Sequence, residues 1–175
     1  DIQVTGTGYE PEGEFKFSNN RENNSSLQDQ LNLFLEAGML CSNAVINRDE
    51  KESICKVIGD PTEGALVSAA RKAGFNKRKN MEENGYNRIG EIPFSSELKY
   101  MAVSYQTPED NYTYVKGAPS VVLNMCKNEL RDNEKQELTK SRIKKLEQKN
   151  REMAQNGLRV LALAYKKGES ADSES

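Results

Sequence analysis

Side chains suited to holding a flat, charged ligand occur at several places in this sequence. Lys116 follows a predicted strand and precedes Gly117, so its ammonium can point at a phosphate while the glycine lets another group approach the backbone. Phe94 lies in a loop-like Pro-Phe-Ser-Ser stretch, where its ring can stack on a purine. Each residue also has a plainer interpretation. The lysine can simply be solvated at a strand end, and the phenylalanine can be buried in a core.

Three further residues extend this set. Lys99 adds a second positive charge for a polyphosphate, and Glu63 can accept a hydrogen bond from an adenine amino group. The position of Glu63 at a predicted helix start, where it can close a capping box, is a sufficient structural explanation. Arg159 lies in an apolar stretch and needs either a salt-bridge partner or a phosphate, because an unpaired buried guanidinium is very costly. The set suits an adenine nucleotide but supplies no nucleophile or general base.

Composition excludes several other classes of function. The 175 residues include no histidine, which removes histidine acid–base catalysis, Ser-His-Asp triads and most zinc sites. The net charge of -2 gives no field that would draw the chain onto nucleic acid or anionic lipid. Three widely spaced cysteines fit reduced cytosolic thiols, and no apolar run is long enough to span a membrane. The Gly8–Gly13 spacing resembles a phosphate loop, but Glu14 and Phe15 follow where Lys-Ser/Thr is required.

Periodicity and turn residues predict an α+β fold. The expected elements of the first half are a strand–turn–strand over 1–17, a loop over 18–26, a helix capped by Ser26 and ending near Cys41, and a helix capped by Asp60 and ended by Gly74. In the second half we expect a hairpin of strands around 101–105 and 112–114, a short helix over 119–127, a long charged helix over 133–156 that stops at Gly157, and a central buried strand over 158–165. These elements predict an antiparallel sheet flanked by helices, in a single domain over 1–167 with a polar tail over 168–175.

Four segments, in this order, resemble the nucleotide-binding domain of P-type ATPases, most of all the type II branch that includes calcium and sodium/potassium pumps. They are Gly59-Asp60-Pro61-Thr62-Glu63-Gly64-Ala65-Leu66, Pro93-Phe94-Ser95-Ser96-Glu97-Leu98-Lys99, Tyr114-Val115-Lys116-Gly117-Ala118-Pro119 and Gly157-Leu158-Arg159-Val160-Leu161-Ala162-Leu163-Ala164. The opening Val4-Thr5-Gly6-Thr7-Gly8-Tyr9 is similar to the start of this domain in calcium-pump-like members. The resemblance covers essentially the whole chain.

The resemblance implies a role for each matching residue. Phe94 is expected to stack on adenine and Glu63 to hydrogen-bond the base. Lys116 and Gly117 are expected to line the pocket for the adenine and phosphates, and Asp60 matches an acidic position nearby.

The same resemblance assigns the remaining site residues. Lys99 and Arg159 are expected to contact the phosphates or ribose, and Met101 and Leu161 to form pocket walls. Ser96 stands where calcium-pump relatives often carry an arginine that helps bind phosphate. Part of the phosphate binding is therefore expected to come from Lys99, or to be weaker.

The family's architecture implies the cofactor and partners. The ligand is expected to be ATP, as MgATP, with magnesium held mainly by a phosphorylation domain whose Asp-Lys-Thr-Gly-Thr segment does not occur in this sequence. The expected partners are the phosphorylation and actuator domains of the same parent chain. The domain is then cytoplasmic, within an integral membrane protein that hydrolyses ATP to transport a cation, with calcium favoured. It should contact the membrane only through the parent's transmembrane helices and bind no nucleic acid.

A function of another class is a non-enzymatic interaction module that docks a partner through the charged helix 133–156. Basic residues on that helix are interleaved with acidic ones, which is more typical of a solvated face. The ATP-binding interpretation is therefore favoured over the interaction module.

Overall fold

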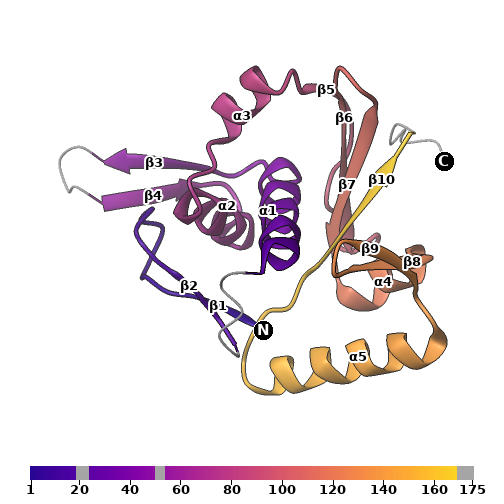
Figure 1. Ribbon diagram of the computed structural model, residues 1–175. Helices are drawn as coiled ribbons and strands as arrows, with labels where there is room; N and C mark the ends of the chain where they lie inside the picture. The colour runs from indigo at the N-terminus through magenta and orange to yellow at the C-terminus, as the bar shows by residue number, and fades with distance from the viewer. Residues whose placement is uncertain (19–23, 50–53, 169–175) are drawn as a thin grey trace. The chain divides into compact units, whose positions relative to one another are not determined.

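The computed structural model describes residues 1–18, 24–49 and 54–168. They form two compact units, residues 1–83 and residues 84 onward. Helices and antiparallel strands occur in both units, so the predicted α+β class with antiparallel pairing is confirmed (Figure 1). The single domain expected over 1–167 stays a prediction. Most of the tail expected over 168–175 lies outside the described residues.

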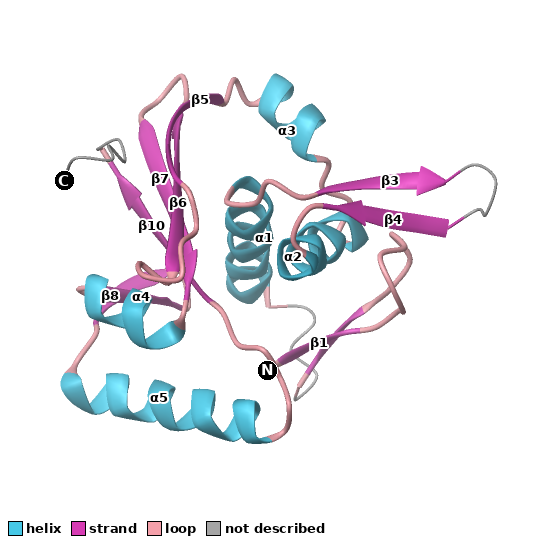
Figure 2. Ribbon diagram, turned by 180° about the vertical axis from the view of Figure 1, so that it is seen from behind, coloured by secondary structure: helices cyan, strands magenta, loops and turns pink. Residues whose placement is uncertain are grey.

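The first unit begins with the expected pair of strands, β1 (Ile2–Val4) and β2 (Phe15–Phe17), which are antiparallel. Three helices follow: α1 (Ser25–Leu40), α2 (Pro61–Lys72) and α3 (Lys77–Glu83). Between α1 and α2 lies an antiparallel hairpin, β3 (Val45–Asp49) and β4 (Ile54–Ile58), which the sequence analysis did not anticipate. The base of this hairpin lies beside α2 (Figures 1 and 2).

The two long helices of this unit bury one apolar cluster. Leu31, Leu35 and Met39 of α1 lie on the helical spacing that the sequence shows, and they pack with Ala70 of α2. The phenylalanines of β2 pack against the same cluster. The sequence predicts an apolar helical face of Leu27, Leu31, Phe34, Leu35 and Met39, and the structure differs at Phe34, which is 48% exposed.

The start of α1 differs from the prediction. The side chain of Asn24, not Ser26, caps the helix by accepting from the backbone N–H of Leu27 at 3.1 Å. Ser26 lies inside the helix. Both residue types cap well and lie two positions apart, so their preferences alone do not decide between them.

The second unit contains a four-stranded antiparallel sheet in the order β10-β7-β6-β5. Its strands are β5 (Asn87–Ile92), β6 (Tyr100–Gln106), β7 (Asn111–Gly117) and β10 (Ala162–Lys167). The expected hairpin is confirmed as β6 and β7, and α4 (Pro119–Met125) confirms the expected short helix. Val103 and Tyr105 on one face of β6 and Ser104 on the other are completely buried.

The predicted charged helix over 133–156 is too long. Its first residues belong to a small hairpin of β8 (Asn128–Arg131) and β9 (Glu134–Glu137), and α5 spans only Lys140–Gln155. Asp132 and Asn133 both have positive φ angles, and this left-handed backbone makes the turn between the two strands. The Asp132-Asn133 pair is typical of a tight hairpin turn, but the charged residues around it favoured the prediction of a helix.

The predicted central strand over 158–165 is also wrong in part. β10 begins at Ala162, and it is an edge strand whose first four residues are half-buried. Apolar composition alone does not distinguish a central strand from an edge strand that has one face covered. Here α4 packs against β7 and β10 and provides that cover.

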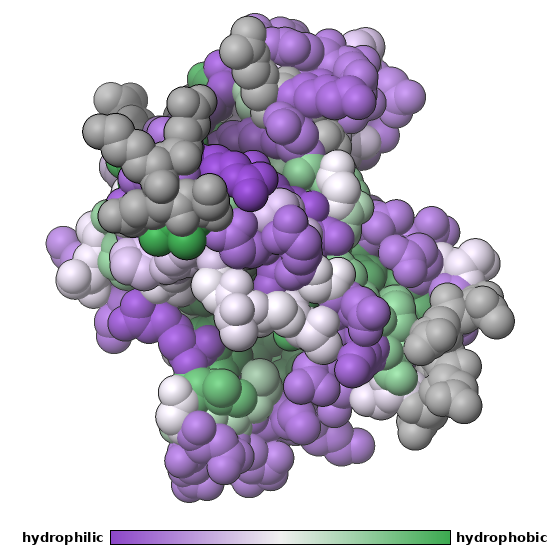
Figure 3. All heavy atoms as spheres, turned by 90° about the vertical axis from the view of Figure 1, so that its left-hand side faces the viewer, coloured by the Kyte–Doolittle hydropathy of each residue, from purple (hydrophilic) through white to green (hydrophobic). Residues whose placement is uncertain are grey.

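Hydrophilic side chains dominate the face drawn in Figure 3, where hydrophobic areas are small and interrupted. None of the described helices is both long enough and apolar enough to cross a bilayer.

Candidate nucleotide-binding site

The antiparallel register brings the candidate residues of the second unit to one end of the sheet. β5 and β7 end where β6 and β10 begin: Tyr100 pairs with Gly117, and Ala162 pairs with Gly117 from the other side. Phe94 follows the end of β5 by two residues, and Lys99 immediately precedes β6. Three segments separated in sequence therefore converge at this end of the sheet (Figure 1).

Met101 and Lys116 lie side by side on one face. They are register partners across β6 and β7, and the ammonium of Lys116 lies 3.1 Å from the thioether sulfur of Met101. Lys116 is only 5% exposed, so the interpretation of a solvated lysine at a strand end is wrong. The structure therefore holds a cationic group within this end of the sheet, next to an apolar wall.

Phe94 lies on the surface. Its side chain is 59% exposed, so the alternative of a core phenylalanine is wrong as well. An exposed aromatic ring on a loop loses nothing by packing against a ligand and removes apolar area from water when it does so. The ring therefore has the accessibility that stacking on a base requires.

The loop between Phe94 and β6 is a hydrogen-bonded turn. The hydroxyl of Ser95 accepts from the N–H of Leu98 at 3.1 Å, and the carbonyl of Ser95 accepts from the N–H of Lys99 at 2.8 Å. Lys99 adopts a φ of 59°, a left-handed conformation that costs a non-glycine residue about 1–2 kcal/mol. Its carbonyl accepts from the N–H of Ala118 at 3.0 Å. These bonds hold the turn against the residues that follow β7.

Gly117 permits this contact. A Cβ atom at Gly117 would lie 2.6 Å from the carbonyl oxygen of Lys99 and 2.7 Å from the Cβ of Tyr100. The expected close approach to this glycine is thus confirmed, and the approaching group is the backbone of the Lys99 turn. Any side chain at position 117 would push that turn away.

Leu161 and Arg159 precede β10 at the same end of the sheet. Leu161 is half-buried and Arg159 is exposed, so the guanidinium has access to water and carries no desolvation cost that a ligand must offset. The argument that an arginine in a buried strand needs a phosphate therefore does not hold here. Arg159 remains a candidate on its position alone.

Asp60 and Glu63 belong to the first unit. Asp60 caps α2 as predicted, its carboxylate accepting from the N–H groups of Thr62 and Glu63 at 2.8 and 3.2 Å. The carboxylate of Glu63 accepts from the N–H groups of Asn43 and Ala44 at 2.6 and 2.9 Å, which ties α2 to the segment before β3. Within the second unit, the structure places Lys99, Met101, Lys116 and Gly117 next to one another. Phe94, Arg159 and Leu161 lie on segments that lead from or to strand ends there, and Asp60 and Glu63 are described within their own unit.

Ser95 has a structural role that its position in the sequence did not indicate. It occurs within a segment noted for its neighbours Phe94 and Lys99, yet its hydroxyl fixes the turn that carries both. Serine hydroxyls often close local turns in this way, but the sequence alone does not show which N–H the hydroxyl of Ser95 meets. Within the described ranges, no three cysteine, aspartate or glutamate side chains form a group that could hold a metal ion.

Comparison with known proteins identifies the family of this chain. Residues 30–175 match the family model of the P-type ATPase cytoplasmic domain N. The chain is 34% identical to a calcium-transporting ATPase of Bacillus subtilis over 99% of its own length and 19% of that relative. It is 37% identical to a cation-transporting ATPase of Synechocystis over 94% of its length and 18% of that relative. A calcium-transporting ATPase type 2C member 1 of Bos taurus is 34% identical over 93% of the chain and 16% of the relative.

The chain thus spans less than a fifth of the length of these relatives. The family match covers most of the chain, and it includes the whole second unit with its convergent sheet end. The protein therefore belongs to the family of P-type ATPase cytoplasmic N domains.

Proposed function

We propose that this chain binds ATP and presents its γ-phosphate to a phosphorylation domain elsewhere in a P-type cation-transporting ATPase. One observation carries the proposal: an exposed aromatic ring, Phe94, stands on a turn whose last residue is Lys99, and that turn is bonded to the end of the strand that carries Lys116. An aromatic ring offers a stacking surface to adenine, and two ammonium groups offer counter-charges to phosphates.

The remaining candidates have supporting places in this proposal. Met101 and Leu161 provide apolar walls at the same end of the sheet, and Arg159 is an accessible cation beside them. For Glu63 and Asp60 we propose the roles that the resemblance implies, Glu63 as the acceptor for the adenine amino group and Asp60 as an acidic residue nearby.

Phosphoryl transfer itself belongs to the parent protein in this proposal. In-line transfer depends on positioning of the phosphate and on metal electrostatics, and this domain supplies the hold on the nucleotide. We infer that magnesium arrives with ATP and is bound mainly by the phosphorylation domain. The actuator domain of the same chain would be the second partner, and the whole would lie on the cytoplasmic side of a membrane protein.

The transported ion is proposed to be a cation. Two of the three relatives described above are named as calcium-transporting and the third as cation-transporting, which favours calcium. No residue described here selects the ion.

Titration with ATP, followed by amide NMR, tests the proposal. We expect shifts to cluster at Glu63, Phe94, Lys99 and Lys116, with a dissociation constant on the order of 0.1–1 mM, because one stacked ring and a few exposed charge contacts yield only about -4 to -5.5 kcal/mol. Shifts confined to α5 would instead favour the interaction-module alternative, since α5 has no buried residue and presents its charged side chains to solvent.

A second expectation concerns turnover. The chain should release no phosphate from ATP above the background rate, because the aspartate that accepts the phosphoryl group belongs to another domain in this proposal. A malachite-green phosphate assay with the purified chain measures this directly. Release that scales with protein concentration and is lost in Lys116→Ala would contradict the expectation.

A further inference from the structure

A pocket lies on the sheet face opposite the candidate nucleotide site. Thr113 and Val115 of β7 alternate with Lys116, and they line this pocket together with Ala164 of β10, the register partner of Val115. α4 and the β8–β9 hairpin complete its walls. Its volume is about 540 Å³, within the range of roughly 300–1,000 Å³ that small-ligand pockets occupy. All of its lining residues belong to the second unit.

About half of the residues that line this pocket are apolar. Val115 and Ala164 form its floor, and Val122, Met125 and Leu130 contribute to its walls. Met125, the last residue of α4, lines the pocket and is 51% exposed. A flexible thioether side chain that lines a hollow can adapt to ligands of different shape. The apolar lining therefore favours a ligand with a hydrocarbon or aromatic body.

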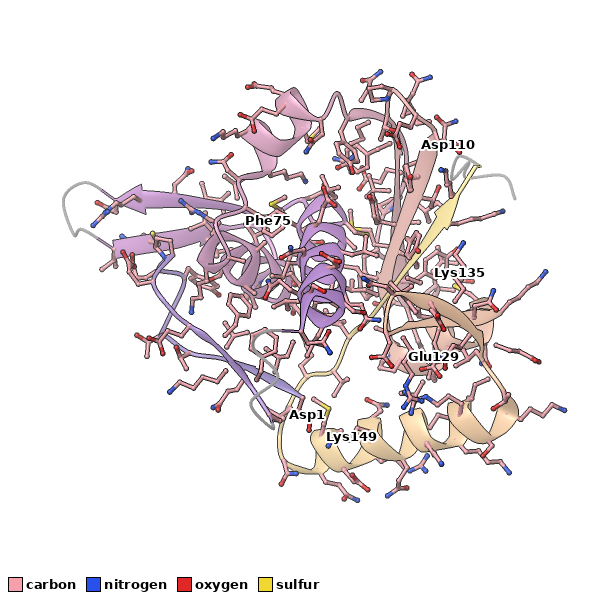
Figure 4. All side chains as sticks on the ribbon, viewed as in Figure 1. Asp1, Phe75, Asp110, Glu129, Lys135 and Lys149 are labelled. Atoms are coloured by element: carbon pink, nitrogen blue, oxygen red, sulfur yellow. The ribbon has the colours of Figure 1, made fainter. Side chains whose placement is uncertain are left out.

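The charged residues of the lining are mostly basic. They are Lys127, Lys135, Lys166, Lys167 and Glu129. The single acid is already engaged, because both oxygens of the Glu129 carboxylate lie 2.8–2.9 Å from Nε of Arg142 on α5. Lys167 lies 3.6 Å from the Asp110 carboxylate, and Lys127 and Lys135 add two further positive charges to the lining. Figure 4 labels Lys135 beside β10 and Glu129 on the side toward α5.

We propose that this pocket binds an organic anion, an apolar body that carries a carboxylate, sulfonate or phosphate group. The apolar floor accepts the body and the lysines at the rim accept the charge. The site shares the strand β7 with the candidate nucleotide site but uses its other face, so both ligands can be bound together. The proposal does not depend on ATP binding.

Cys126 supplies an internal reporter. It lines the pocket at the end of α4, and burial raises the pKa of its thiol above the ordinary value. Alkylation of Cys126 is therefore slow at neutral pH and becomes faster as pH rises, because the thiolate is the reacting species. A ligand in the pocket should slow it further by covering the sulfur.

The probe is anilinonaphthalene sulfonate, whose fluorescence rises in apolar surroundings. Its uncharged analogue, N-phenylnaphthylamine, has the same rings without the sulfonate and is the matched neutral probe. We expect the sulfonate to bind at least roughly fivefold more tightly than the neutral analogue and to protect Cys126 from N-ethylmaleimide, measured by peptide mass spectrometry. Equal binding of the two probes would overturn the requirement for an anion.

Substitutions in the pocket lining test where the sulfonate probe binds. The double substitution Lys127→Glu and Lys135→Glu should weaken the sulfonate roughly tenfold, since it reverses two charges at the rim. The control, Lys144→Glu with Lys145→Glu, makes the same change in net charge at exposed positions of α5 that do not line the pocket. Ala164→Leu fills the floor and should weaken both probes. Equal weakening by the rim and control pairs would place the anion elsewhere and overturn the proposal.

Two further arms identify the source of the anion and separate this site from the ATP site. ATP at saturating concentration should leave the sulfonate affinity unchanged, whereas competition would place the probe in the nucleotide site and overturn the proposal. Flotation with phosphatidylglycerol vesicles tests a lipid source, and we expect no flotation because the site is a pocket rather than a flat basic surface. Flotation lost in the rim double variant would assign the pocket to a membrane lipid instead of a soluble anion.

Discussion

At the scale of single residues, Phe94 and Lys116 are unusual for opposite reasons. An aromatic ring is exposed, where most are buried, and a lysine is buried, where most are exposed. A bound nucleotide would cover the ring and would place phosphate oxygens near the ammonium. The combination is more informative than either residue alone.

Phe94→Ala should weaken ATP binding by roughly 1–3 kcal/mol, the range found for the loss of one stacked base. Isothermal calorimetry, or NMR titration where binding becomes too weak for calorimetry, measures the change. The matched control is Phe34→Ala, because Phe34 is also an exposed phenylalanine, 48% exposed on α1. An affinity unchanged by Phe94→Ala would show that the ring does not stack.

At the scale of elements, the turn over 95–99 determines where the ring and Lys99 point. Ser95 closes the turn with its hydroxyl, Lys99 adopts a left-handed backbone, and the carbonyl of Lys99 is bonded to Ala118 after β7. The turn thus connects the ends of β5, β6 and β7 at the candidate site. Loosening the turn should reduce affinity without touching any group proposed to contact ATP.

Ser95→Ala tests this element. Loss of a hydrogen bond of this kind costs about 0.5–1.5 kcal/mol, so ATP affinity should fall roughly two- to tenfold. Ser96→Ala is the control, since Ser96 is its exposed neighbour of the same type, and it should change affinity by less than roughly twofold. NMR titration measures both, and urea denaturation shows whether either variant unfolds. A larger effect from Ser96→Ala would indicate that Ser96 itself contacts the nucleotide.

At the scale of the whole molecule, ATP binding should appear as added stability. A ligand that binds only the folded chain stabilises it by RT ln(1 + [L]/Kd), which at about 10 mM ATP gives about 1.4–2.7 kcal/mol for a dissociation constant of 0.1–1 mM. For a chain of this size that raises the melting temperature by roughly 3–10 °C. Differential scanning fluorimetry measures the shift, and Phe94→Ala should make it smaller. A shift unchanged in that variant would place the bound ATP elsewhere.

The elements that the sequence predicted correctly are those with strong local signals. The helix α2 has Asp60 as its cap and the left-handed Gly74 after its end, and the hairpin of β6 and β7 has period-2 alternation around a polar turn. The hairpin β8–β9 was missed because its short strands are rich in charged and polar residues. The hairpin β3–β4 was missed although four of the five residues of β4 are apolar. The prediction of a single helix over 133–156 depended on the charged composition of that range.

The sequence by itself determined the residue types of the candidate site, their order along the chain and the resemblance that names the family. Those properties follow from side-chain chemistry and local spacing, which need no fold. Only the tertiary structure decided that Phe94 is exposed, that Lys116 is buried against Met101 and that β10 is an edge strand. Burial and strand order depend on which distant segments pack together. The turn that ends at Lys99, for example, packs against Gly117 only because the folded sheet brings the two together.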